Sequence, residues 1–198
     1  MKKGNSTALV RRTSSLPALL GRELPKYFTR EEVHRILEAT ENERDKLMLN
    51  LMWQTGLRVS ELLSLKPSNI DFRGGVLKVP TLKRKGHPFR VIPLQPSLLG
   101  ELARFIASNK IGDEERLFPL TRFRVFQIVK EACKRAGIED ERAHPHTFRH
   151  SFAVHCVLHG VPVLVLNEWL GHSNIENTLI YTKVLASDSR QFYDRLPF

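Results

Sequence analysis

The chain has 198 residues and carries 31 Lys and Arg against 21 Asp and Glu, a formal net charge of +10. Hydrophobic residues make up 41% of it, enough to bury a core, which argues against extensive disorder. A chain this basic attracts polyanions, and the alternative interpretation of the charge is a solvated basic face. The length fits one domain with a short arm rather than two full domains.

Three further classes of protein are disfavoured. The two cysteines, Cys133 and Cys156, form no C-x-x-C pair, which excludes a disulfide scaffold and a thiolate zinc finger. The apolar run at residues 8–10 is too short for a signal peptide. Residues 151–167 hold no Asp, Glu, Lys or Arg but contain Gly, Pro and His, and so predict a buried helix and a turn instead of a membrane span. We expect a soluble, cytoplasmic protein with no contact to a membrane.

The first half of the chain predicts helices after a basic start. Residues 1–24 hold five Lys or Arg against one Glu and predict a flexible arm, which either lies along a phosphate backbone or has no role. Thr29 opens a capping box, and apolar residues then recur at helical spacing. A second helix is expected from about residue 43 to its stop at Gly56, and a short third one over 60–63.

The pattern then changes to strands and back to helices. Residues 76–79 and 89–92 are β-rich runs on either side of a basic hairpin at 83–88. Further helices are expected over about 97–109, 121–136 and 146–159, from Pro162 to Gly171, and from Ser173 onward. Residues 187–198 predict a tail or a short helix. The expected fold is mainly α with a small antiparallel β-sheet, an α+β fold.

Residues able to do chemistry gather near the end of the chain. His146 and Arg149 are three residues apart and so share one helix face. His172 directly follows a glycine that ends a helix, and Tyr181 supplies a phenol at the end of an apolar helix. Far upstream, Arg58 is expected to be buried at a helix junction, where its charge needs a partner. That partner is either Glu61 or a carbonyl, or else the phosphate of a ligand.

This set of side chains suits phosphoryl transfer. Two guanidinium groups and a histidine match the oxyanion of a phosphodiester under attack. A tyrosine hydroxyl acts as a nucleophile when a base and a cation lie beside it, and a hairpin lysine can protonate the departing oxygen. The sequence has no D-x-D motif, carboxylate cluster or Walker loop, so no metal or other cofactor is expected.

Four segments together resemble the catalytic domain of tyrosine recombinases, the phage-integrase family. They are GLRVSELL at 56–63, VPTLKRKGHPFRVIPL at 79–94, HPHTFRHSFA at 144–153 and LGHSNIENTLIYT at 170–182. The resemblance covers about residues 25–186, taken as a catalytic domain. It is specific because Arg, hairpin Lys, His-x-x-Arg, Gly-His and Tyr occur in the family's order. Most members also carry an N-terminal DNA-clamp domain. Only the basic arm precedes the catalytic domain in this sequence, as expected either of a short member of the family or of a catalytic fragment.

The resemblance implies a site-specific recombinase that cleaves and rejoins double-stranded DNA through a 3′-phosphotyrosyl link, without metal or ATP. Tyr181 would attack the phosphate, and His146 would take the tyrosine proton. The non-bridging oxygens would be held by Arg58, Arg149 and His172. The lysine that would protonate the 5′ oxygen is Lys83 or Lys85. Strand alternation places both on the same face of the hairpin and so cannot choose between them. The segment Thr81-Leu82-Lys83 looks more like the family's entry to this turn, which favours Lys83.

The family also implies partners. Members act as homo-oligomers, in a synaptic tetramer on DNA, and residues 187–198 are apolar enough to dock on a neighbouring protomer. Integration, excision, inversion and dimer resolution are all compatible with the sequence. Two other functions remain in view: a non-catalytic DNA-binding regulator of the same fold, and a type IB topoisomerase-like strand transferase.

Other residues have ordinary interpretations. The pairs His146/His150 and His155/His159 have i,i+4 spacing, as in some zinc sites, but no third ligand supports a metal. His150 either supports the site or contacts DNA, and packing is the preferred interpretation. Trp169 lies on an apolar helix face and is expected to be a core residue, while the resemblance implies a second role for it, bracing the turn at His172. Contacts with the DNA backbone are expected from Lys and Arg at 83, 84, 85, 122, 124, 130, 134 and 135.

Overall fold

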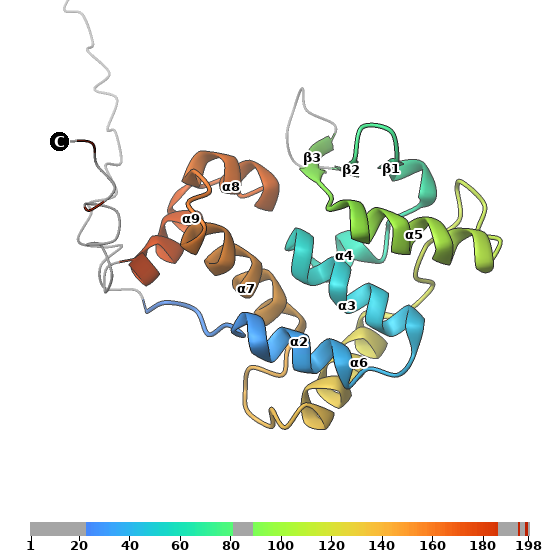
Figure 1. Ribbon diagram of the computed structural model, residues 1–198, viewed down its shortest axis with the longest axis horizontal. Coiled ribbons are helices and arrows are strands. Elements are labelled where there is room, and N and C mark those ends of the chain that lie inside the picture. The colour runs from blue at the N-terminus through green and yellow to red at the C-terminus, as the bar shows by residue number, and fades with distance from the viewer. Residues whose placement is uncertain (1–22, 81–88, 186–193, 195–196, 198) are drawn as a thin grey trace, which may run out of the picture.

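The computed structural model describes residues 23–80 and 89–185, together with 194 and 197 (Figure 1). Its α-helices are α2 (Arg30–Glu38), α3 (Glu43–Thr55), α4 (Val59–Leu62), α5 (Pro96–Ser108), α6 (Arg122–Arg135), α7 (Pro145–Leu158), α8 (Val163–Leu170) and α9 (Glu176–Leu179). The remaining elements are the 3-10 helices η1 (Pro67–Asn69) and η2 (Ile180–Leu185) and the strands β1 (Ile70–Asp71), β2 (Val76–Pro80) and β3 (Phe89–Pro93). The predicted fold class, mainly α with a small antiparallel sheet, is confirmed.

The sheet has the strand order β1-β2-β3, and both pairs are antiparallel. In the β2–β3 pair Leu77 faces Ile92 and Val79 faces Arg90, and all four side chains are buried. β1 was not predicted, since a strand of two residues is too short to show an alternating pattern. The hairpin that joins β2 to β3, with Lys83 and Lys85, lies outside the described residues.

Most predicted helix ends are where the sequence placed them. Thr29 and Glu32 form the expected capping box of α2, and Gly56 and Gly171 end α3 and α8 in the left-handed conformation. The last helix is an exception. It was expected from Ser173 but begins at residue 176, and after one turn it continues as the 3-10 helix η2.

The later start of α9 has a local cause. The Asn174 side chain accepts a hydrogen bond from the backbone N–H of Glu176 at 3.0 Å. Such an Asx turn competes with helix formation, and helical propensity alone does not reveal it. Tyr181 lies in η2, a tighter helix with poorer hydrogen-bond geometry, rather than in an α-helix.

α3 and α7 pack against each other and divide the molecule (Figure 1). The sheet and α5 lie on one side of them, α8 and α9 on the other, and α8 also reaches β3. The two long helices come close at Gly56, where a Cβ would lie 2.5 Å from Cδ1 of Phe152. This approach brings the start of α4 next to the middle of α7. Among the described residues, no helix has the length and apolar character needed to cross a membrane.

Candidate active site

Arg149 is the most deeply buried cation of the candidate site. It lies on α7 with 4% of its surface exposed. Its Nη1 donates to the carbonyl of Gly56 and its Nη2 to the carbonyl of Leu170, both at 2.7 Å. Burial, and then the nearby charge of Arg58, lower the Arg149 pKa to about 10. The guanidinium is therefore still charged at neutral pH and is held by carbonyl dipoles.

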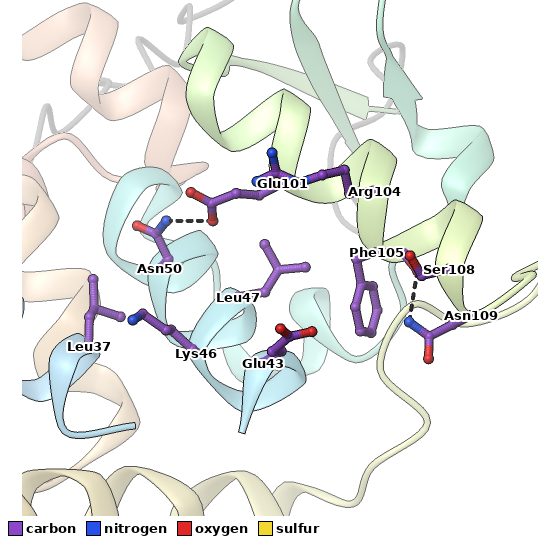
Figure 2. Close-up of a pocket in the computed structure, with 10 residues that line it drawn as sticks. All are labelled: Leu37, Glu43, Lys46, Leu47, Asn50, Glu101, Arg104, Phe105, Ser108 and Asn109. Atoms are coloured by element: carbon purple, nitrogen blue, oxygen red, sulfur yellow. Dashed lines mark hydrogen bonds between the residues drawn. The ribbon is translucent and has the colours of Figure 1, made fainter. Parts of the chain in front are cut away.

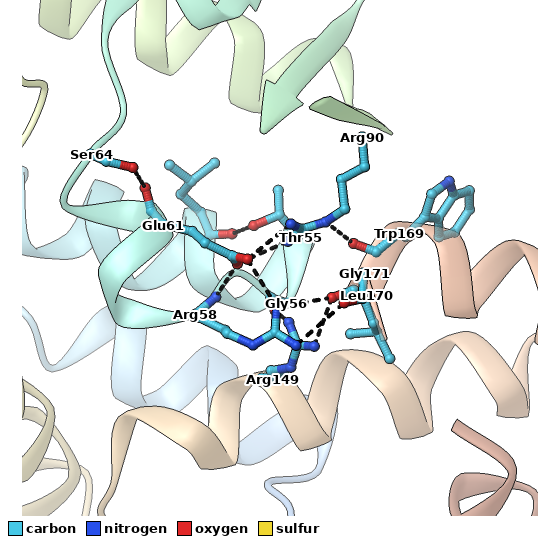
Figure 3. A network of polar contacts seen from close by, with 11 residues as sticks. Thr55, Gly56, Arg58, Glu61, Ser64, Arg90, Arg149, Trp169, Leu170 and Gly171 are labelled. Atoms are coloured by element: carbon cyan, nitrogen blue, oxygen red, sulfur yellow. Dashed lines mark hydrogen bonds and ion pairs between the residues drawn. The ribbon is translucent and has the colours of Figure 1, made fainter. Parts of the chain in front are cut away.

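Arg58, at the start of α4, contacts the same backbone carbonyl as Arg149 of α7. It is the residue before α4, and its Nη1 is 2.9 Å from Oε1 of Glu61. Longer contacts of 3.5 Å lead to the carbonyls of Leu170 and Gly171 (Figure 3). Both guanidinium groups thus converge on the Leu170 carbonyl.

The expected burial of Arg58 is wrong, because 38% of its side chain is exposed. Its long stem carries the guanidinium out of the helix junction to the protein surface. The partners that the sequence left open are Glu61 and backbone carbonyls. A guanidinium with donors still facing solvent can also receive an anion.

A buried ion pair between Arg90 and Glu61 holds Glu61 in the position from which it contacts Arg58. Arg90 of β3 places Nη1 and Nη2 at 2.9 and 2.8 Å from the two carboxylate oxygens of Glu61, and its Nε donates to the carbonyl of Trp169 at 2.8 Å (Figure 3). Burial raises the Glu61 pKa, but the hydrogen bonds and charge of Arg90 outweigh it, and the pKa falls below its usual value. Glu61 therefore stays ionised and orients Arg58.

Sequence reasoning missed Arg90. The signal was its position in β3, where Arg90 shares the buried phase of the strand with Ile92 while Phe89 and Val91 are exposed. A charge in that phase requires a carboxylate partner. The Trp169 side chain packs against both apolar clusters, as the core expectation has it. Its main-chain carbonyl, 2.8 Å from Arg90 Nε, ties α8 to β3.

Tyr181 lies within the field of both guanidinium groups. It is 2% exposed, and its hydroxyl is 2.8 Å from Nδ1 of His150 on α7. Burial raises the Tyr181 pKa, and the charges of Arg149 and Arg58 partly oppose this. The partner of the phenol is thus His150, a residue for which packing was the preferred interpretation.

His172 belongs to the same cluster. Its Nδ1 is 2.9 Å from the hydroxyl of Thr178, and that hydroxyl donates to the side chain of Asn167 at 2.8 Å. The hydroxyl must therefore accept from His172 Nδ1–H, which leaves Nε2 of the neutral ring without a proton. Burial, then the charges of Arg149 and Arg58, lower the His172 pKa to about 3.

His146 lies at the edge of the cluster. Its side chain is exposed on the first turn of α7, with its ring parallel to that of His144, 5.4 Å away. Burial, and then the nearby His144 and Arg149, lower the His146 pKa. The structure thus gathers Arg58, Arg149, His172 and Tyr181, with His146 beside them and Lys83 outside the described residues.

Comparison with known proteins agrees with this geometry. Residues 26–188 match the model of the phage integrase family. The chain belongs to this family. It is 36% identical over 185 residues to tyrosine recombinase XerA of Pyrococcus horikoshii, and the match covers 88% of this chain and 62% of that relative. It is 33% identical over 224 residues to a tyrosine recombinase of Pseudothermotoga lettingae, and the match covers 98% of this chain and 76% of that relative. The catalytic domain of bacteriophage HP1 integrase has the same fold, with a TM-score of 0.66 and 28% identity over 87% of this chain and 96% of that domain.

A pocket of the described residues lies apart from the candidate site. A pocket of about 500 Å³ opens between α3 and α5 (Figure 2). Asn50 spans it with a hydrogen bond of 3.1 Å to Glu101, and acidic and basic side chains both line it. The arginine and tyrosine cluster lies elsewhere, against α7 and α8.

His155 and His159 have structural partners. The ring of His155 packs on Trp53 at 5.0 Å, and His159 Nδ1 is 2.8 Å from the carbonyl of His155. In the part of the chain that the structure describes, no three His, Cys, Asp or Glu side chains are grouped so as to hold a metal ion.

The half-buried imidazoles of His150 and His172 predict how stability depends on pH. Burial is the main cause that lowers the pKa of His150 to about 4 and that of His172 to about 3. In the unfolded chain both return to an ordinary pKa of ~6.5, so between about pH 7 and pH 5 the unfolded state binds more protons than the folded state. We expect the free energy of unfolding, measured in urea, to fall over this range.

A His150→Asn variant is expected to show a smaller fall. The exposed His34→Gln variant serves as the control, because it leaves both half-buried imidazoles in place and should keep the wild-type dependence. An unfolding free energy that is constant or higher at about pH 5 would contradict neutral histidines at the site.

Proposed function

We propose that the protein is a site-specific DNA recombinase that breaks and rejoins strands through Tyr181. The observation that carries this proposal is the convergence of Arg58 and Arg149 on the Leu170 carbonyl, within the electrostatic reach of the Tyr181 phenol. Two guanidinium groups supply the paired donors that a phosphate under attack needs.

In this proposal each residue has one task. Tyr181 Oη attacks phosphorus and gives its proton to His146, the residue that the resemblance assigns to this step. The bond to the 5′ oxygen breaks, and a 3′-phosphotyrosyl link and a free 5′-hydroxyl result. Arg58 and Arg149 bind the non-bridging oxygens. His172 joins them once the anion raises its pKa and Nε2 gains a proton. The 5′ oxygen takes its proton from a hairpin lysine, for which the resemblance favours Lys83.

The reaction needs no external energy, because the phosphotyrosyl bond conserves that of the phosphodiester. A 5′-hydroxyl from a partner strand reverses the step and completes the exchange. The Tyr181 side chain is 2% exposed, so we infer that DNA binding shifts η2 to bring the phenol to the phosphate. Its 3-10 geometry makes η2 easier to shift than an α-helix.

Double-stranded DNA as the partner accounts for the charge of +10. Exposed cations line α6, whose first turn also carries the 70% exposed Phe123; they are Arg122, Lys130, Lys134 and Arg135. Both relatives compared above are named tyrosine recombinases. From the family resemblance we further propose that the chain acts as a homotetramer on DNA and is located in the cytoplasm. The chain spans only 62% of the Pyrococcus relative.

The test is covalent trapping on a library of nicked duplexes, in which the short 5′ fragment diffuses away after cleavage. We expect the wild-type protein to form a DNA adduct on a subset of sequences that survives denaturation. A DNA-binding regulator of the same fold would bind and leave no adduct. A topoisomerase would relax supercoiled plasmid without regard to sequence. Either result would overturn the proposal.

A further inference from the structure

The outward face of α6 carries a stripe of side chains that take no part in the cleavage steps above. Its members recur at i, i+4, i+7 and i+11 and so share one helix face: Phe123, Gln127, Lys130 and Lys134. Gln127 is half-buried and the other three are exposed, whereas the opposite face of the helix is buried in the core. α6 therefore presents an aromatic ring at its first turn and two cations along the rest of its length.

Phe123 is the most exposed of the large apolar side chains that the structure describes, at 70%. A single exposed apolar residue is ordinary on a protein surface, but this ring lies among cations, with Arg122 and Arg124 on either side of it in the sequence. Cations beside an exposed ring suit a nucleic acid, because phosphates pair with the cations and a base packs its apolar edge on the ring.

The first turn of α6 lies at the edge of the candidate active site. Two ring contacts connect them: the ring centroids of Phe126 and His144 are 5.3 Å apart, and those of His144 and His146 are 5.4 Å apart. The His146 pKa is lowered first by burial and then by charges that include Arg122. α6 packs on the start of α7, so this arrangement does not depend on the position of η2 (Figure 1). DNA whose scissile phosphate lies at the site therefore passes close to Phe123.

The two arginines beside Phe123 are engaged differently. Arg124 Nη1 is 3.3 Å from the Gln127 side chain and 3.4 Å from that of Glu131, so this guanidinium is held by its own helix. Arg122 is exposed, and its guanidinium forms no hydrogen bond or ion pair within the part of the chain that the structure describes. Its donors can therefore hold a backbone phosphate beside the scissile one.

We propose that Phe123 is a specificity-determining residue of this chain, which packs against the C5 methyl group of a thymine in the major groove beside the cleavage position. The proposal rests on double-stranded DNA as the partner in the proposed function, and it names a base that this function leaves open. The major groove, about 12 Å wide, admits an α-helix, and thymine is the base that presents a methyl group there. With the first turn of α6 toward the bases, Lys130 and Lys134 lie about 10 and 16 Å back along the helix axis, where they reach phosphates at the rim of the groove.

The first experiment selects bound duplexes from a pool with random base pairs, using the wild-type protein and two Phe→Ala variants. We expect the wild-type protein to enrich thymine at one position, Phe123→Ala to lose this enrichment and no other, and Phe72→Ala to keep it. Phe72 is the matched control because it is 44% exposed, in the turn after β1 and away from α6 (Figure 1). Since both side chains are exposed, the thermal midpoints of the two variants should stay close to wild type.

A second measurement isolates the methyl group. Deoxyuridine replaces the preferred thymine, which removes the methyl group and keeps every hydrogen-bonding group of the base. We expect the wild-type affinity to fall about fourfold, the effect of one buried methyl group, and Phe123→Ala to bind the two duplexes equally. Phe123→Leu, which keeps an apolar side chain, should keep part of the preference. Lys130→Gln, on the same stripe, should weaken binding to both duplexes alike, because it removes a phosphate contact.

The outcomes are distinct. If Phe123→Ala weakens binding to all sequences by the same factor, or if it responds to deoxyuridine as the wild-type protein does, Phe123 does not read thymine and the proposal is wrong. A wild-type protein that enriches no thymine also overturns it. Adduct formation on the selected duplexes tests the recombinase function separately. Adducts without a thymine preference due to Phe123 contradict this inference alone, and such a preference without adducts contradicts the recombinase function alone.

Discussion

Replacing Tyr181 with phenylalanine is expected to abolish the covalent adduct with DNA completely. The variant loses only the hydroxyl that attacks phosphorus, so no other group at the site can form the bond. DNA affinity should stay within about twofold of wild type, because it comes mainly from Lys and Arg contacts to phosphates. The lost hydrogen bond to His150 should cost about 1 kcal/mol of stability, so the variant remains folded.

The measurement is gel or mass-spectrometric detection of the adduct on a nicked duplex, with a binding assay on the intact duplex. Tyr27→Phe is the matched control, because this substitution also removes a single phenol oxygen. Tyr27 is half-buried against the apolar cluster that contains Tyr181. Its adduct should form at the wild-type level. An undiminished adduct in Tyr181→Phe would show that another residue is the nucleophile.

Glu61→Gln is expected to be among the most destabilising single substitutions at the site. It removes the carboxylate that holds Arg90, whose side chain is 4% exposed, at 2.8 and 2.9 Å. Leaving a buried charge without its partner costs about 3 to 5 kcal/mol. The same change frees Arg58, which loses its 2.9 Å ion pair, so cleavage should slow even where the protein is folded.

Urea denaturation measures the loss, and Glu114→Gln is its control. Glu114 also pairs with a cation, Lys66, at 2.8 Å, but its side chain is 74% exposed. Solvent screens an exposed pair of this kind, so its loss should change the free energy of unfolding very little. Equal losses in the two variants would contradict a structural role for the buried pair between Glu61 and Arg90.

The parts of the fold set by local physics were predictable. Thr29 caps its helix with its own hydroxyl, and Gly56 and Gly171 end helices because they adopt positive φ without strain. Competition between local interactions was harder to foresee. The Asn174 side chain delays the start of α9 by three residues, and the change from α9 to the 3-10 helix that holds Tyr181 has no signal in the sequence pattern.

The site was predictable in composition and only partly in geometry. The order of Arg58, His146, Arg149, His172 and Tyr181 identified the group of residues, but their partners depend on contacts far apart in the sequence. Arg90 approaches the carbonyl of Trp169 across 79 positions. Spacing on α7 could not decide between His146 and His150 as partner of the phenol, because residues four apart lie on one face and only the packing of η2 selects between them.

The central claim is that Arg58 and Arg149 neutralise the charge of one phosphate. Its most direct test is a duplex in which a neutral methylphosphonate replaces the scissile phosphate. Arg58→Ala is expected to cleave the ordinary phosphate about 10²- to 10³-fold more slowly than wild type, and to regain most of this loss on the methylphosphonate, which has less charge to stabilise. Both rates come from one variant, so any loss of folding cancels. An equal deficit of Arg58→Ala on the two substrates would contradict a shared anion site.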